Sequence, residues 1–196
     1  GPDAHRISVL SAAGNKNFSP FLRMIKAWQS ARLPHLVVTD FDSLTKSTDR
    51  AVITGVKHAG YTLSGESTFI SSVDAAIDKN ERDFEAVAKS ATGWFKNAGA
   101  DVFVFTSDLE FALVDDNNKN AAAVVMNNCH TGQSDYLHGY DLAALRRQIG
   151  SKGVPINPMK DPPLKRPFVH KKLAETIDLK SPHPDIKRLL SLVESL

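Results

Sequence analysis

Two pairs of acidic residues, each spaced acid-x-acid, are the residues whose types and spacing favour chemistry. The first pair, Asp40 and Asp42, follows the apolar run Leu36-Val37-Val38. In extended backbone, residues two apart point to the same side of a strand, so this pair can converge on one point. Carboxylate oxygens favour hard cations such as Mg²⁺, Mn²⁺ or Ca²⁺. The pattern therefore predicts a divalent-metal site.

The second pair, Asp108 and Glu110, follows the uninterrupted apolar run Val102–Phe105. Such a run is typical of a strand buried on both faces of a parallel sheet. An Asp-rich turn with solvated carboxylates is the simpler explanation for the first pair alone. Two apolar strands that each end in the same acidic pattern favour a metal site at the carboxyl ends of the strands, where open α/β sheets bind ligands.

The elements that position these acids form a β-α-β unit at the start. A strand over 6–10 and a helix over 19–28 precede the strand at Leu36, which implies a parallel strand pair with a right-handed crossover. Apolar spacing predicts further helices over 48–59 and 81–98, and a short strand over Thr68-Phe69-Ile70. Beyond Val114 the expected elements are helices, over 121–127, 142–149, 167–177 and 185–193, with an irregular connection over 153–163.

The composition describes an ordinary globular chain. It has 196 residues, of which 42% are hydrophobic and 23% charged. This length predicts one domain, or one domain with an appendage. No run of 18 apolar residues or secretory signal is visible, so no membrane span is expected. The single cysteine, Cys129, excludes an internal disulfide and fits a reducing cytoplasm.

The charge is distributed unevenly along the chain. Residues 146–172 contain eight Lys or Arg and one acid, a net charge of +7, which leaves −5 for the remainder because the total is +2. The cations are Arg146, Arg147, Lys152, Lys160, Lys165, Arg166, Lys171 and Lys172. They are either a solvated surface or a surface for phosphates, and an acidic metal centre beside a basic segment favours a phosphodiester substrate.

These motifs together resemble a Toprim domain, and more closely the C-terminal nuclease region of the OLD (overcoming lysogenization defect) family of endonucleases. Thr39-Asp40-Phe41-Asp42 is similar to that family's Asp-x-Asp motif, and Ser107-Asp108-Leu109-Glu110 to its Asp-Leu-Glu motif. The opening segment 7–18 is similar to a strand of that family and the Gly/Lys/Asn turn that follows it before a helix. The segment 165–174 is similar to its late basic segment.

The resemblance implies a fold, an activity and roles for residues. The fold would be α/β, a Toprim-like Rossmannoid parallel sheet flanked by helices with an appended, mainly helical C-terminal part. The activity would be metal-dependent DNA cleavage with two Mg²⁺ ions, or Mn²⁺ or Ca²⁺ in the same sites, held by Asp40, Asp42, Asp108 and Glu110. Lys165, or alternatively Arg166, would stabilise the charge at the scissile phosphate, and the DNA backbone would contact Arg146, Arg147, Lys171 and Lys172.

The resemblance also implies a domain organisation. A catalytic core would span 1–114, and a mainly helical part that completes the site would span 115–196. The family's glutamate motif is absent upstream of Ile7, so it is expected to precede the sequence given, as is an N-terminal ATPase domain. The protein would be bacterial, cytoplasmic and active in phage defence, with DNA, the ATPase domain and a second copy of itself as partners.

Two other functions are consistent with the same residues. A haloacid-dehalogenase-type phosphatase would use Asp40 as nucleophile and Asp42 as acid/base, with Thr106-Ser107 ending its second motif strand and Lys165 as its lysine. Leu44, in place of Thr or Val, and the β-α unit ahead of the motif count against it. The second of these functions is that of a catalytically inactive module that binds DNA or dimerises.

Overall fold

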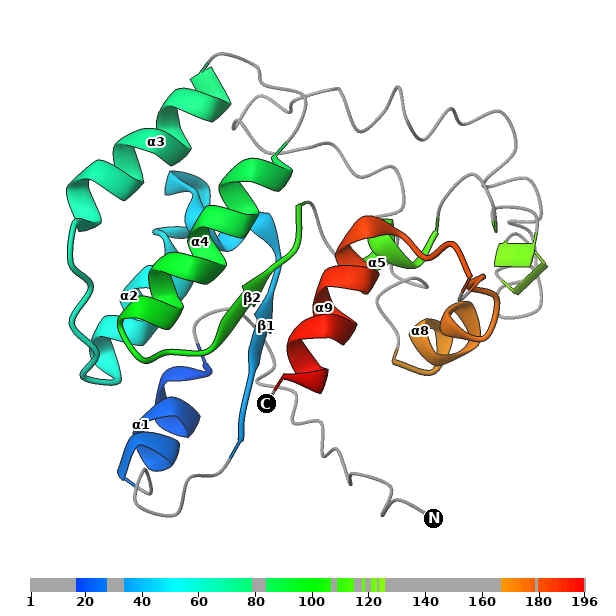
Figure 1. Ribbon diagram of the computed structural model, residues 1–196, viewed down its shortest axis with the longest axis horizontal. Helices are drawn as coiled ribbons and strands as arrows, with labels where there is room; N and C mark the ends of the chain where they lie inside the picture. Colours follow the sequence, from blue (N-terminus) through cyan, green and yellow to red (C-terminus); the bar gives the residue numbers. More distant parts are fainter. Residues whose placement is uncertain are drawn as a thin grey trace.

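The computed structural model describes the backbone over residues 17–27, 34–78, 84–106, 109–114, 118, 121–122, 124–125, 167–178 and 180–195. This part of the chain is mixed α/β and mostly helical (Figure 1). In chain order its elements are α1 (Ser19–Ala27), β1 (Val37–Thr39), the 3₁₀ helices η2 (Phe41–Leu44) and η3 (Lys46–Thr48), α2 (Ala51–His58), α3 (Glu66–Asp78), α4 (Glu85–Asn97), β2 (Val102–Val104), α5 (Leu109–Leu113), α8 (Pro167–Ala174) and α9 (Pro184–Glu194).

The described sheet consists of β1 and β2, which pair in parallel with Val37 opposite Val102 and Thr39 opposite Val104. Backbone hydrogen bonds continue past both ends of the pair, from Val37 N to Asp101 O (2.9 Å) and from Phe105 N to Thr39 O (2.9 Å). Parallel strands need a long crossover connection, which here contains α2, α3 and α4. The carboxyl ends of the two strands therefore meet at one edge of the sheet.

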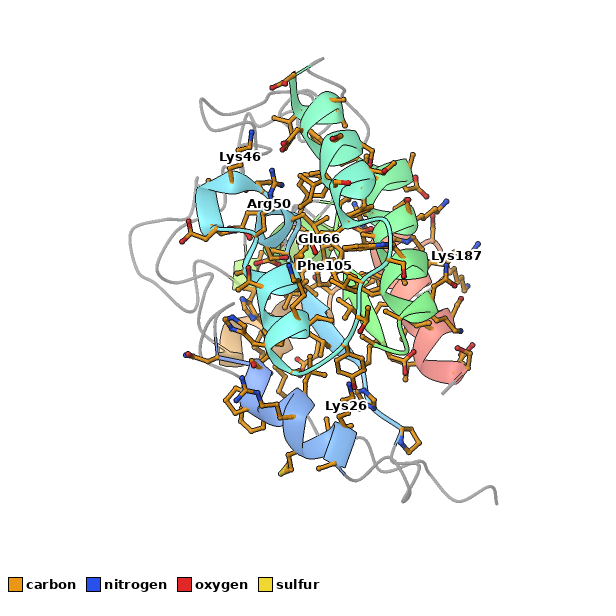
Figure 2. The ribbon with its side chains drawn as sticks, turned by 90° about the vertical axis from the view of Figure 1, so that its left-hand side faces the viewer. Lys26, Lys46, Arg50, Glu66, Phe105 and Lys187 are labelled. Carbon is orange, nitrogen blue, oxygen red and sulfur yellow. The ribbon has the colours of Figure 1, made fainter. Side chains whose placement is uncertain are left out.

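Helices cover both faces of this strand pair. Val102 and Val104 are buried in one apolar cluster with Ala88, Ala91 and Phe95 of α4. The alternate residues of the same strand belong to a second cluster on the opposite face, whose members are Phe103, Phe105, Ala112, Leu36, Leu109, Ile186, Leu189 and Leu192. Figure 1 shows α4 on one side of the strands and α9 on the other, and Figure 2 shows Phe105 in the interior. The period-two alternation of β2 thus builds three layers, helix, sheet and helix.

The predicted strand over 68–70 is wrong, because these residues lie in α3. Phe69, Val73 and Ala76 are its buried residues, and their spacing of four and three residues is that of one helix face. Phe69 stacks on Trp94 of α4 with ring centroids 4.2 Å apart. The strand preference of Thr, Phe and Ile is therefore overridden by packing of α3 against α4.

Most of the other expected elements that fall on described residues are confirmed. The helices predicted over 19–28, 48–59, 81–98, 167–177 and 185–193 correspond to α1, α2, α4, α8 and α9. Of the helix predicted over 121–127, residues 121–122 and 124–125 are described and have helical backbone. The strand over 6–10, the helix over 142–149 and the connection over 153–163 lie outside the described residues. The division into 1–114 and 115–196 stays a prediction.

No helix in the described part of the chain combines the length and the apolar character that crossing a membrane requires.

Two exposed glycines on α4 and at its end give opposite predictions. Gly99 follows α4 with a φ of +79°, whereas Gly93 lies within the helix, and an added Cβ would meet nothing within 4 Å at either position. Gly99→Ala should lower the free energy of unfolding by about 1 kcal/mol, because an L-residue is strained at positive φ. Gly93→Ala should raise it by about 0.5–1 kcal/mol through helix propensity. Urea unfolding measures both changes, and a shift of the same sign in the two variants would contradict the assignment.

Candidate acidic site at the carboxyl ends of the strands

The first acidic pair lies in a turn and not in a strand. Asp40 has extended backbone (φ −79°, ψ 160°), but the 3₁₀ helix η2 begins at the next residue and contains Asp42. The prediction that both acids share one side of an extended strand is therefore wrong. Ser43 explains the turn, since its backbone N and its Oγ both donate to Asp40 O, at 3.2 and 2.7 Å. Ser and Asp favour such local bonds over continuation of a strand.

A buried aromatic side chain between the two acids holds this turn in place. Phe41 is completely buried, and its ring centroid lies 4.6 Å from that of Phe84, the residue that precedes α4. Asp40 and Asp42 on either side of it are both half-buried. The carbonyl oxygen of Asp42 accepts hydrogen bonds from Thr45 N, Thr45 Oγ1 and Thr48 Oγ1, at 2.7 to 2.9 Å. The turn that carries the acids is thus fixed at its aromatic centre and along its backbone.

Arg50 is a second support of the same turn. Its Nη1 donates to Leu44 O at 2.8 Å, and its Nη2 lies 2.8 Å from both carboxylate oxygens of Asp74 in α3. Lys46 approaches the same carboxylate at 3.3 Å, and Figure 2 shows both cations on the segment that follows β1. Arg50 itself lies just before α2 with a φ of +51°, in the left-handed region. Sequence reasoning missed this pair because its members are 24 residues apart.

The Asp40 carboxylate lies beside the second acidic segment. Its Oδ1 accepts a hydrogen bond from the backbone N of Leu109, the first residue of α5, at 3.2 Å. The two residues are 69 positions apart in the chain. This contact places Asp40 beside Leu109, the residue between the two acids of the second segment, at one edge of the sheet.

The second pair differs from the expectation in its backbone. β2 ends at Val104, and Glu110 belongs to α5, so its backbone is helical where a strand end is predicted. Asp108 and the side chain of Glu110 lie outside the described residues. Whether four carboxylates converge thus stays a prediction.

The described residues contain at most part of a metal centre. Among them, no group of three or more His, Cys, Asp or Glu is placed to hold an ion. Asp40 and Asp42 nevertheless offer only oxygen donors, half-buried at the sheet edge, which is the donor chemistry of a hard divalent cation. The residues present fit part of such a site.

The basic segment reaches this region through α8. Lys171 and Lys172 lie in its last turn and are exposed. Leu173, the next residue of the same helix, is completely buried. Asn118 Nδ2 donates both to Leu113 O, at the end of α5, and to Thr176 Oγ1, just after α8. α8 therefore packs beside the helix that begins at Leu109. Lys165, Arg166, Arg146 and Arg147 lie outside the described residues.

Lys172 has an acidic neighbour one helical turn later. Lys172 Nζ pairs with Glu175 at 3.0 Å, with more than half of each side chain exposed. Such a pair contributes little to stability in water.

Asp185 is a buried charge near the same edge that the sequence pattern did not single out. Its side chain is 1% exposed, and its Oδ2 accepts from Thr106 N and Thr106 Oγ1 at 2.9 and 2.6 Å. Arg188, one helical turn later, lies 2.6 Å from Oδ1. From sequence, Asp185 looked only like the first residue of a helix. Its partner is 79 positions away, so no local signal could reveal the contact.

A groove of about 540 Å³ lies elsewhere, between α4 and α9. Its lining residues are Glu85, Lys89, Thr92, Phe103, Pro184, Lys187, Arg188, Ser191, Leu192 and Ser195. None of the predicted site residues is among them. The acidic edge, and not this groove, therefore carries the candidate chemistry.

Comparison with protein-family models, with curated proteins and with solved structures found no match for this chain.

The Arg50–Asp74 pair predicts a pH-dependent stability. Burial alone would raise the pKa of the Asp74 carboxyl, but hydrogen bonds and charge from Arg50 and Lys46 outweigh burial and lower it. A lowered pKa in the folded state stabilises the fold above the unfolded-state pKa of about 3.9, and this stabilisation is lost as pH falls through the folded-state pKa. Asp74→Asn should cost about 1–2 kcal/mol at pH 7, discounted for partial exposure.

The measurement is urea unfolding of the wild type and Asp74→Asn at pH 7, 5 and 3. The difference in the free energy of unfolding between the wild type and the variant should be constant from pH 7 to 5 and should shrink toward pH 3. Glu66→Gln is the control, because the exposed Lys57–Glu66 pair should contribute about 0.5 kcal/mol or less. If the difference for Asp74→Asn grew on acidification, the pKa of Asp74 would not be lowered on folding and the prediction would be refuted.

Proposed function

We propose that this chain is the nuclease part of a metal-dependent DNA endonuclease that resembles the OLD family. The observation that carries the proposal is the hydrogen bond from Leu109 N to Asp40 Oδ1. It brings the beginnings of two acidic segments together at the carboxyl ends of two parallel strands. This is the edge at which open α/β sheets bind their ligands.

The proposed fold is a Toprim-like Rossmannoid sheet. Support comes from the parallel pairing of β1 with β2, from the two buried faces of β2 and from the helices on both sides of the strands. In this proposal 1–114 is the catalytic core, and 115–196 contributes the helices that complete the site. The packing of α8 and α9 beside α5 and β2 is what such a contribution requires.

The proposed site holds two divalent cations, Mg²⁺ or a substitute such as Mn²⁺ or Ca²⁺, on Asp40, Asp42, Asp108 and Glu110. When bound, such ions supply an activated water and stabilise the leaving oxygen. The chain itself orients Asp40 through Leu109 N and fixes Asp42 through the bonds to its carbonyl. Lys165 or Arg166 stabilises the charge that develops at the phosphate, and Arg146, Arg147, Lys171 and Lys172 contact the DNA backbone.

The resemblance supplies the proposed context of the domain. The protein works in the bacterial cytoplasm in phage defence, its N-terminal ATPase domain controls the nuclease, and the assembly is a homodimer. Each of these proposals rests on the motifs over 39–42, 107–110 and 165–174.

The phosphatase is the second candidate, favoured by one observation. β2, which pairs directly with the Asp40 strand, is followed at its carboxyl end by Thr106, as the second motif strand of that class requires. Against it, the Thr106 hydroxyl donates to the buried Asp185, at 2.6 Å, and is thereby held toward α9. The endonuclease is therefore preferred. The inactive module differs from both in binding DNA without any hydrolysis.

Plasmid cleavage tests the proposal on a chain extended upstream to include the glutamate motif that the resemblance implies. With Mg²⁺ or Mn²⁺ the protein should cut supercoiled DNA, and chelation should abolish cutting. Asp40→Asn should reduce the rate at least about 100-fold, because it removes the charge but keeps an oxygen that can accept from Leu109 N. Asp78→Asn, an exposed carboxylate at the end of α3, is the matched control and should leave the rate unchanged.

The alternatives predict other outcomes of the same assay. Hydrolysis of p-nitrophenyl phosphate with intact DNA, and an acyl phosphate on Asp40, would identify the phosphatase. Salt-dependent DNA binding with neither activity would identify the inactive module. Cleavage that is indifferent to both metal and Asp40→Asn would refute the acidic site.

A further inference from the structure

We infer that Asp185 is a positioning residue for the acidic site, acting through Thr106. The inference rests on the proposed function and adds a residue that neither acidic motif contains. It assigns to α9 a part in the site beyond covering the sheet.

The first step is the set of groups around Asp185. Its buried carboxylate accepts the backbone N and the hydroxyl of Thr106 on Oδ2, and Arg188 Nη1 on Oδ1. The backbone N of Asp185 donates to His183 Nδ1 at 3.2 Å, which fixes the start of α9. A buried ion pair is seldom needed for stability, since apolar residues of similar volume often serve as well. What the carboxylate adds is direction, because it determines where Thr106 lies.

The second step is the double attachment of β2. Arg188 Nη2 donates to Val104 O at 3.2 Å, and its guanidinium lies over the Phe103 ring, 4.8 Å from the centroid. Together with the bonds from Thr106 to Asp185, these contacts join the first two turns of α9 to the end of β2 and to the residue two positions after it. The end of β2 is therefore held by a helix from the far end of the chain.

The third step is the connection from Thr106 to the site. Only Ser107 and Asp108 separate Thr106, which Asp185 holds, from Leu109, whose backbone N donates to Asp40. Since a chain advances by at most about 3.6 Å per residue, holding Thr106 in place limits how far Leu109, and with it the hydrogen bond to Asp40, can move. Residues that orient metal ligands through one hydrogen bond typically change metal affinity about 10–100-fold when they are replaced. Loss of the bond from Asp185 to Thr106 should therefore weaken the metal site.

The test compares two substitutions of Thr106 that differ in one hydrogen bond. Thr106→Val keeps the shape of the side chain but removes the hydroxyl donor, whereas Thr106→Ser keeps the donor. Isothermal titration calorimetry with Mn²⁺ should show binding weakened about 10-fold in Thr106→Val and within about twofold of the wild type in Thr106→Ser. Asp185→Asn should weaken binding at least as much. Ile186→Val, which trims the packing of α9 on Phe103, controls for a general loosening of the helix.

Amide hydrogen exchange gives a readout that needs no metal. The exchange rate at Leu109 should rise in Thr106→Val, and it should stay at the wild-type value in Thr106→Ser and Ile186→Val. Unchanged exchange and unchanged Mn²⁺ affinity in Thr106→Val would overturn the inference. If Thr106→Val had no effect but Asp40→Asn abolished Mn²⁺ binding, the proposed metal site would stand and only the role of Asp185 would be refuted. If the wild type bound no Mn²⁺, both would fall together.

Discussion

The parallel pairing of β1 with β2 is the constraint on which the rest of this structure depends. With Thr39 opposite Val104, the chain leaves both strands at the same edge. The segments that follow the two strands are thereby brought close although they are far apart in sequence, and Leu109 N donates directly to Asp40. Because Val102 and Val104 face α4 while Phe103 and Phe105 face α9, shifting β2 by one residue would exchange its two buried faces. Packing of the core therefore fixes the register of β2 against β1, and this register positions the segments that carry the acids.

Helices from distant parts of the chain then rigidify this edge. Arg50 and Asp74 hold the turn after β1, and Asp185 and Arg188 hold the end of β2. Both pairs connect a charged side chain to a backbone carbonyl or amide of the segments that carry the acids. Charged hydrogen bonds of this kind supply direction, which apolar packing alone does not. The backbone at the carboxyl ends of the two strands is therefore held by helices on both faces of the sheet.

Local patterns in the sequence predicted much of this fold and less of the site. The apolar run Val102–Phe105 and the stripe that became α4 were recognisable because their periods, two and 3.6, are set by the backbone itself. Thr68-Phe69-Ile70 misled because the preference of three residues for a strand is weaker than the packing of α3 on α4. Asp42 misled because Ser43 and Thr45 form turn bonds that the spacing of the acids does not reveal. Pairs such as Asp185 with Thr106 are a product of the tertiary structure, and no local pattern encodes them.

The central claim is that the two acidic segments face one metal centre, and metal-directed cleavage of the polypeptide tests it most directly. Fe²⁺ substituted for Mg²⁺ generates hydroxyl radicals with ascorbate and peroxide, and these cut the backbone close to the bound ion. Mass spectrometry of the fragments should locate cuts at both 40–42 and 107–110, and excess Mg²⁺ or Asp40→Asn should suppress both sets. Cuts confined to one segment, or cuts that Asp40→Asn leaves unchanged, would contradict a shared centre and with it the proposed endonuclease.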